Sequence, residues 1–145
     1  MYLAEVHQLI EPHLQNQKVA WQQEGSLLPL WSYGTADHLR QVFLNLSMNA
    51  IEAMQPLGGN LTIAMHADLL AGQAVVAIKD TGCGIPTDNL QTIFDPFFTT
   101  KERGSGLGLS IVYEILERHS GSISVESQAN QGTTFTVLLP LTIPR

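Results

Sequence analysis

Segments with helical periodicity alternate with short strand-like runs along this chain, and this order restricts the fold more than any other feature of the sequence. Apolar residues recur at helical spacing over three segments: Tyr2 to about Lys18, Thr35 or Asp37 to about Met54, and Leu107–His119. Six shorter runs predict strands: Val19–Gln23, Leu28–Tyr33, Leu61–Leu69, Gln73–Asp80, Ser122–Ser127 and Thr133–Leu139. We therefore expect an α+β fold, a two-layer α/β sandwich in which about three helices cover one face of a mixed, mostly antiparallel sheet.

Glycine and proline mark the ends of the predicted helices. The segment Gln55–Gly59 ends the second helix, and Gly121 ends the third, whose last turn carries Arg118 and His119. A further short helix is predicted near Asn89–Ile93, inside a glycine-rich region that runs from 81 to 108.

Composition narrows the classes of function. A chain of 145 residues has room for one domain, so residues 1–145 are expected to form a single unit. The net charge of -6 argues against a nucleic-acid surface, which needs a basic patch. No apolar run reaches the roughly 18–20 residues of a membrane-spanning helix, and the first residues lack the basic start of a signal peptide. We expect a cytoplasmic domain that does not itself enter a membrane, although a longer protein containing it can be membrane-anchored.

The second predicted helix carries two stripes of different chemistry. Its buried stripe consists of apolar residues: Leu39, Val42, Phe43, Leu46, Ala50 and Ala53. Asn45, Asn49 and Glu52 follow at i, i+4 and i+7 along the border of that stripe. Amide oxygens in such a row can ligate a hard cation or hydrogen-bond a phosphate, and the alternative is an ordinary solvated helix surface.

A carboxylate stands on the apolar side of the strand that ends at residue 80. Asp80 has the same parity as Val76 and Ile78, so it is expected to face the core and to need a hydrogen-bond donor. Gly82 and Gly84 follow, and glycines allow a sharp turn and the close approach of a flat ligand. The segment predicts a purine clamp in which Asp80 accepts from an exocyclic amine and Ile85 offers an apolar wall. The alternative is a strand that ends in an Asx turn.

A glycine run, Gly104–Ser110, opens the third helix and follows Phe94–Lys101. Backbone N–H groups at a helix N-terminus bind anions, and Lys101 and Arg103 would add charged contacts from a closing loop. The phenylalanine pair, Phe97 and Phe98, is interpreted as a hydrophobic anchor for that loop.

Thr133 is the last candidate, because its parity with Phe135 and Val137 turns its hydroxyl inward, where it can support Asp80. A strand threonine satisfied by the backbone is the alternative.

In this order, the motifs resemble the ATP-binding domain shared by sensor histidine kinases, type II topoisomerases, the Hsp90 chaperone and mismatch-repair ATPases, a Bergerat-type fold. The corresponding segments are an N box (Asp37–Met54), a G1 box (Asp80–Pro86), an F box (Phe94–Lys101), a G2 box (Gly104–Ser110) and a last glycine box (Gly132–Phe135).

The resemblance implies ATP and Mg²⁺ as cofactors and assigns roles to the motif residues. Asn49 would ligate Mg²⁺, and Lys101 and Arg103 would act catalytically on the terminal phosphates. The ATP-binding set would comprise Asn45, Asn49, Glu52, Ala53, Asp80, Gly82, Gly84, Ile85, Gly104, Gly106, Leu107, Gly108 and Thr133. Many histidine kinases have a basic residue where Glu52 stands, which leaves the γ-phosphate contact to Lys101 and Arg103.

Asn45 bears on the phosphate acceptor. Superfamily members that hydrolyse ATP or phosphorylate serine usually carry a glutamate base at this position, and an amide cannot accept a proton. Asn45 therefore favours a histidine kinase, whose acceptor nitrogen is already nucleophilic. The implied partners are a phosphoacceptor-histidine dimerisation domain and the receiver domain of a response regulator. His7 precedes Pro12 as in the phosphoacceptor motif, but we interpret it as a helix-surface histidine. The alternatives are an anti-sigma-type serine kinase and a non-catalytic ATP-sensing module.

Overall fold

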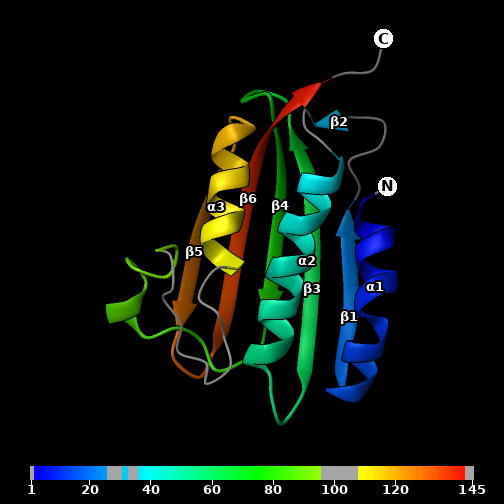
Figure 1. Ribbon diagram of the computed structural model, residues 1–145, viewed down its shortest axis with the longest axis vertical. Helices are drawn as coiled ribbons and strands as arrows, with labels where there is room; N and C mark the ends of the chain where they lie inside the picture. The colour runs from blue at the N-terminus through cyan, green and yellow to red at the C-terminus, as the bar shows by residue number, and fades with distance from the viewer. Residues whose placement is uncertain (1, 26–30, 33–35, 96–107, 143–145) are drawn as a thin grey trace.

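The computed structural model describes residues 2–25, 31–32, 36–95 and 108–142, and its elements form two layers (Figure 1). In this part of the chain three α-helices lie on one face of a six-stranded sheet. The helices are α1 (Tyr2–Asn16), α2 (Ala36–Ala53) and α3 (Gly108–Arg118). The strands are β1 (Val19–Gly25), β2 (Trp31–Ser32), β3 (Gly59–Asp68), β4 (Gln73–Asp80), β5 (Ser122–Gln128) and β6 (Gly132–Thr142). The predicted α+β sandwich is confirmed.

The sheet is mixed and mostly antiparallel, as expected. Its strand order is β1-β3-β4-β6-β2, with β5 also paired to β6. Only the β1–β3 pair is parallel among the described strands. Strand β6 is the longest and pairs with β4 along one edge and with β5 and β2 along the other. The last strand in the sequence therefore lies inside the sheet.

The core lies between the sheet and α2, which packs against both α1 and α3 (Figure 1). Alternate residues of β4 and β6 face the helices and are buried: Ala74, Val76, Ile78, Phe135, Val137 and Leu139. The predicted apolar stripe of α2 meets them and is buried from Leu39 to Ala50, whereas Ala53 at the end of the helix is partly exposed. The α2 periodicity was therefore a sound guide to the core.

Two predicted elements differ from the structure. The short helix expected near Asn89–Ile93 is a single 3₁₀ turn, η1 (Thr87–Asn89), followed by turns. The 3₁₀ turn itself has no buried residue, and Ile93, which is buried, lies in the turns that follow it. The strand expected at Leu28–Tyr33 is described only as the two residues of β2, and the rest of that segment lies outside the described residues.

The end of α3 also differs in detail from the prediction. Ser120, and not Gly121, adopts the left-handed conformation, with φ of 57°. Gly121 N–H donates to the Leu116 carbonyl at 2.8 Å, and Ser120 N–H donates to Glu117 at 3.1 Å. These two bonds form a Schellman motif, which satisfies the last carbonyls of the helix. A serine therefore occupies the position that usually takes glycine.

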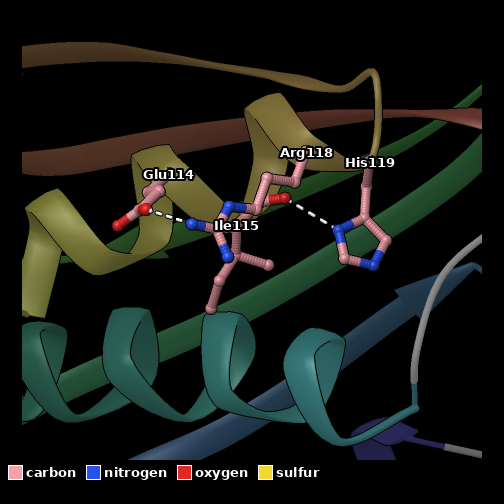
Figure 2. A network of polar contacts seen from close by, with 4 residues as sticks. All are labelled: Glu114, Ile115, Arg118 and His119. Atoms are coloured by element: carbon pink, nitrogen blue, oxygen red, sulfur yellow. Dashed lines mark hydrogen bonds and ion pairs between the residues drawn. The ribbon is translucent and has the colours of Figure 1, made fainter.

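Side chains in the last turn of α3 add further polar contacts (Figure 2). The His119 ring nitrogen Nδ1 lies 2.8 Å from the Ile115 carbonyl oxygen, and Arg118 pairs with Glu114 at 2.6 Å. Cationic and hydrogen-bond donor groups at this position interact favourably with the negative end of the helix dipole. This network lies at the opposite end of α3 from Gly108, so we interpret it as stabilising the end of the helix.

The left-handed serine generates a stability prediction. Ser120→Gly should raise the free energy of unfolding by about 1 kcal/mol, because glycine adopts this conformation without steric cost. Urea unfolding followed by circular dichroism measures the change, and Ser120→Ala, which keeps a Cβ atom, is the matched control with little expected effect. Destabilisation by glycine would show that the serine is not strained.

Candidate functional site

Asp80 is a buried carboxylate at the end of β4. Only 2% of its surface is exposed, and it lies on the helix-facing side of the sheet, as its parity predicted. Its Oδ1 atom accepts a hydrogen bond of 2.8 Å from the Gly82 N–H, two residues on. This contact is an Asx turn, so the structural alternative considered for this motif is present. A carboxylate accepts several hydrogen bonds, so the turn does not prevent Asp80 from also accepting from a ligand.

Thr133 lies beside Asp80 in the neighbouring strand. Thr134 pairs with Lys79 in the antiparallel register, so one further step sets Thr133 opposite Asp80. Thr133 is 5% exposed, and its hydroxyl contacts the hydroxyl of Ser127 at 2.9 Å. Asp80 and Thr133 are among the residues around an open hollow of about 500 Å³ that extends to Lys79 and Leu90. The structure therefore brings the two predicted clamp residues together.

Ser127 is a site residue that the sequence analysis missed. Its Oγ accepts from the Ile85 N–H at 2.7 Å and donates to the Gly132 carbonyl at 3.0 Å. Ser127 is paired with Thr133 in the β5–β6 hairpin, and paired strand residues share a face. Pairing the two predicted strands with each other could therefore have indicated Ser127. A serine in an exposed edge strand gives no such signal from its own residue type.

The loop after Asp80 is held by backbone bonds to two other elements. The Cys83 N–H donates to the Ala53 carbonyl at the end of α2, at 3.0 Å. The Cys83 carbonyl accepts from the Asn130 N–H in the β5–β6 turn at 2.6 Å. Gly82 fits against the same Ala53 carbonyl. Ala53 therefore contributes through its backbone, by fixing the loop against α2.

Gly84 has the turned backbone expected from the sequence, and a second contact also requires a glycine there. Its φ is 74°, and a Cβ atom there would lie 2.1 Å from the Gln128 carbonyl oxygen. The space that the missing side chain leaves is filled by the protein's own backbone. The glycine thus allows the loop to pack on the β5–β6 turn.

Apolar residues flank the clamp. Ile85 is half-buried and packs against the hydrophobic core. Phe94 also packs there, with its ring centroid 5.8 Å from that of Tyr113 and 6.3 Å from that of Phe135. Phe97 and Phe98, expected to anchor the loop, lie outside the described residues.

The polar stripe of α2 leads from the clamp toward the start of α3. Asn45 and Asn49 are half-buried, and Glu52 is exposed. Asn45 Nδ2 donates to the carbonyl of Gly108, the first residue of α3, at 3.3 Å. This contact fixes which way the amide points and leaves Oδ1 as the atom that can accept from a ligand. The eight steps from Asn45 to Ala53 rise about 12 Å along the helix.

Several predicted residues cannot be located relative to this stripe. Lys101, Arg103, Gly104, Gly106 and Leu107 lie outside the described residues. Gly108 is described and exposed, and it begins α3, as the glycine run predicted. Of the predicted phosphate-binding loop, only this helix start is described.

His7 has contacts that agree with a structural role. Its ring stacks on Trp21 of β1, with centroids 4.3 Å apart and planes within 2° of parallel, and its Nε2 lies 2.9 Å from Glu11. Strand β3 separates β1 from β4, which carries Asp80. The histidine is therefore part of the α1–β1 packing on the side away from the clamp (Figure 1).

Comparison with known families now gives a result that agrees with this geometry. The family model described as "Histidine kinase-, DNA gyrase B-, and HSP90-like ATPase" matches residues 34–143. The chain belongs to this family. The matched segment of this ATPase family includes α2, the loop after β4, the start of α3 and Thr133.

Relatives of known name are kinases. The chain is 45% identical over 109 residues to Sporulation kinase E of Bacillus subtilis (strain 168), and these cover 75% of the chain and 14% of that kinase. It is also 45% identical over 109 residues to the sensor histidine kinase ZraS of Escherichia coli (strain K12), covering 75% and 23%. The chain thus spans about a seventh to a quarter of the length of these kinases. They favour the histidine kinase interpretation over the serine kinase alternative.

Solved structures give the same fold for nearly the whole chain. The catalytic domain of histidine kinase ThkA, in a nucleotide-free form, matches with a TM-score of 0.83 and 31% identity, covering 96% of this chain and 91% of that domain. Full-length ShkA in complex with AMPPNP matches with a TM-score of 0.86 and 28% identity, covering 99% and 30%. Within the described residues no helix has the length and apolar character needed to cross a membrane.

The packing of Gly84 generates a prediction with a matched control. Gly84→Ala should lower the free energy of unfolding by about 3 kcal/mol, because it combines an unfavourable φ with a collision against backbone. Gly72 has a φ of 68°, but a Cβ atom added there would have no other atom within 4 Å. Gly72→Ala should therefore lower the free energy of unfolding by only about 1 kcal/mol. Chemical denaturation measures both. Equal losses would mean that the approach to Gln128 carries no cost.

Proposed function

We propose that the chain, residues 1–145, is the ATP-binding catalytic domain of a sensor histidine kinase, which transfers the γ-phosphate of ATP to a histidine on a separate helical domain. The observation that carries the proposal is the buried Asp80 carboxylate beside Thr133, in line with the polar stripe of α2. Family membership and the sensor kinases among the relatives support it.

The clamp suits the edge of an adenine ring. Asp80 offers a charged acceptor on the core side of the sheet, and an exocyclic amine is the donor that such a group would bind in a nucleobase. Ile85 provides apolar surface next to it, which suits the face of a purine. A buried carboxylate also discriminates strongly, because a ligand that offers a lone pair in place of a donor would face its negative charge.

The other end of the stripe suits phosphates and a magnesium ion. Backbone N–H groups at the start of α3 would face the phosphates, with Asn45 beside them. Mg²⁺ takes few protein ligands when it is bound together with a nucleotide, and an amide oxygen of Asn49 is of the right type. The described residues contain no cluster of three or more acidic, histidine or cysteine side chains, which agrees with an ion held mainly by the phosphates. The ion would neutralise charge on the transferred phosphoryl group.

The acceptor follows from what Asn45 cannot do. Its amide nitrogen donates to Gly108, and an amide does not act as a general base at any pH of interest. A hydroxyl or water acceptor needs such a base, whereas a neutral histidine nitrogen does not. Lys101 and Arg103 would supply the remaining positive charge at the terminal phosphate, as catalytic residues on a loop. Glu52 is exposed and adds none.

The proposed partners are a phosphoacceptor-histidine dimerisation domain, normally in the same polypeptide, and the receiver domain of a response regulator. The exposed start of α3 is the described element nearest to the proposed phosphates, so the acceptor histidine would approach from that side. ATP supply sets the compartment, and we assign the domain to the cytoplasm.

Removing the charge of Asp80 tests the nucleobase contact. Asp80→Asn keeps an oxygen for the Gly82 N–H but loses the carboxylate, so ATP affinity should fall by about 30-fold, the value of a hydrogen bond to a charged group. Isothermal titration calorimetry measures the affinity, with circular dichroism to verify folding. Asp88→Asn, an exposed carboxylate in η1, is the matched control and should bind as the wild type does. Unchanged affinity in Asp80→Asn would contradict the clamp.

Asn49 is tested through magnesium. The wild type should bind ATP more tightly with Mg²⁺ than without it, and Asn49→Ala should lose about tenfold of that gain while keeping its affinity for metal-free ATP. Asn60→Ala, an exposed asparagine in β3, serves as the control. If Asn49→Ala weakens both forms equally, the side chain acts on the nucleotide or the fold and does not hold the ion.

Phosphate transfer is tested by supplying the acceptor. With γ-labelled ATP the chain alone should remain unlabelled, and a helical phosphoacceptor domain from the same protein should gain a label that acid removes, as phosphohistidine does. An acid-stable label on a partner would instead indicate a serine acceptor. Stable labelling of the isolated chain would contradict transfer to a separate domain.

A further inference from the structure

The hydroxyl of Ser127 makes three contacts that join different parts of the site. It lies 2.7 Å from the backbone nitrogen of Ile85, 3.0 Å from the carbonyl oxygen of Gly132 and 2.9 Å from the hydroxyl of Thr133. The residue is half-buried in β5, outside the motifs that mark the family resemblance. None of the roles proposed above uses it.

A count of protons fixes the direction of these bonds. A carbonyl oxygen only accepts, so the single hydroxyl proton of Ser127 is donated to Gly132. The Ile85 N–H only donates, and it uses one lone pair of the serine oxygen. With no proton left on Ser127, the Thr133 hydroxyl must be the donor in the third bond. Its proton points toward Ser127, and its lone pairs remain as acceptors.

We propose that Ser127 is a positioning residue for nucleobase selectivity, which holds the Thr133 hydroxyl as an acceptor beside Asp80. The inference rests on the proposed ATP-binding function and deepens it. An adenine amine has two N–H donors, one for each of the two acceptors. A 6-oxo purine has an acceptor at that position, which faces lone pairs on both sides. The charge of Asp80 requires a hydrogen-bond donor on the ligand. By holding the Thr133 hydroxyl as an acceptor, Ser127 makes Thr133 require such a donor as well.

The same bonds separate this role from a merely structural one. The contact with Ile85 secures the loop that carries the apolar wall, so loss of the serine hydroxyl should weaken every purine nucleotide to some extent. Only the contact with Thr133 should change the preference between purines, because it alone sets a donor or an acceptor at the ligand. The ratio of two affinities is therefore the informative measurement.

The experiment compares dissociation constants for ATP and inosine triphosphate, each with Mg²⁺, in the intact chain. The wild type should prefer ATP. In Ser127→Ala the Thr133 hydroxyl can rotate and donate to the 6-oxo group, so the preference should fall by about tenfold, the value of one hydrogen bond. Ser127→Cys keeps the size of the side chain with a much weaker hydrogen-bonding group, and should shift the ratio the same way if the alanine variant folds poorly. Ser124→Ala, exposed on the same strand, should leave the ratio unchanged.

A double-mutant cycle shows whether the effect passes through Thr133. In a Thr133→Val background, replacing Ser127 should no longer alter the ratio. A wild type that prefers ATP, with the same or a stronger preference in both Ser127 variants, overturns this inference and leaves the proposed function standing. A shift that persists in the Thr133→Val background also overturns it. A wild type that binds neither nucleotide overturns the proposed function, and this inference with it.

Discussion

The backbone of Cys83 bonds to both layers of the molecule at one point. Its N–H donates to the last carbonyl of α2, and its carbonyl accepts from the turn between β5 and β6. These bonds fix the loop after β4 against the helix layer and against the sheet at the same time. The Asx turn of Asp80 precedes this residue, and the Ile85 contact with Ser127 follows it. Because the Cys83 side chain is exposed, the constraint depends on the backbone and on the glycines beside it.

The sequence was most informative where a pattern has one physical cause. The apolar stripe of α2 and the parity of Asp80 and Thr133 follow directly from helical and strand geometry, and the structure agrees with them. Contacts between distant backbones have no such pattern. The sequence suggested the turn at Gly84, but not the close approach of the Gln128 carbonyl, which lies 44 residues further along the chain. Ser120 adopts the left-handed conformation of the Schellman motif at the end of α3, although it is not a glycine. Ser127 was missed because serine is ordinary in an edge strand.

In the proposed site, the nucleobase half lies on strands. Asp80, Thr133 and Ser127 are strand residues, and their positions are fixed by the register of β4, β5 and β6. Asn45 connects that half to the start of α3 through Gly108. As proposed, base recognition would use only this sheet and α2, which suits a domain that makes up 14% of one relative and 23% of another. The likeness to the ThkA catalytic domain covers 96% of the chain and 91% of that domain.

Strand β6 occupies the interior of the sheet although it comes last in the sequence. During synthesis, β4 must therefore leave the exit tunnel of the ribosome with one edge unpaired. That edge stays unpaired until β6 has been made as far as residue 140. The strand that completes the hydrogen-bond ladder also carries Thr133, so the ligand-binding end forms only when the whole sheet does. Exposed edges of this kind invite association with other nascent chains, and the charged side chain of Lys79 near the end of β4 is of the type that discourages it. Synthesis of the domain thus passes through a stage at which its most aggregation-prone edge is open.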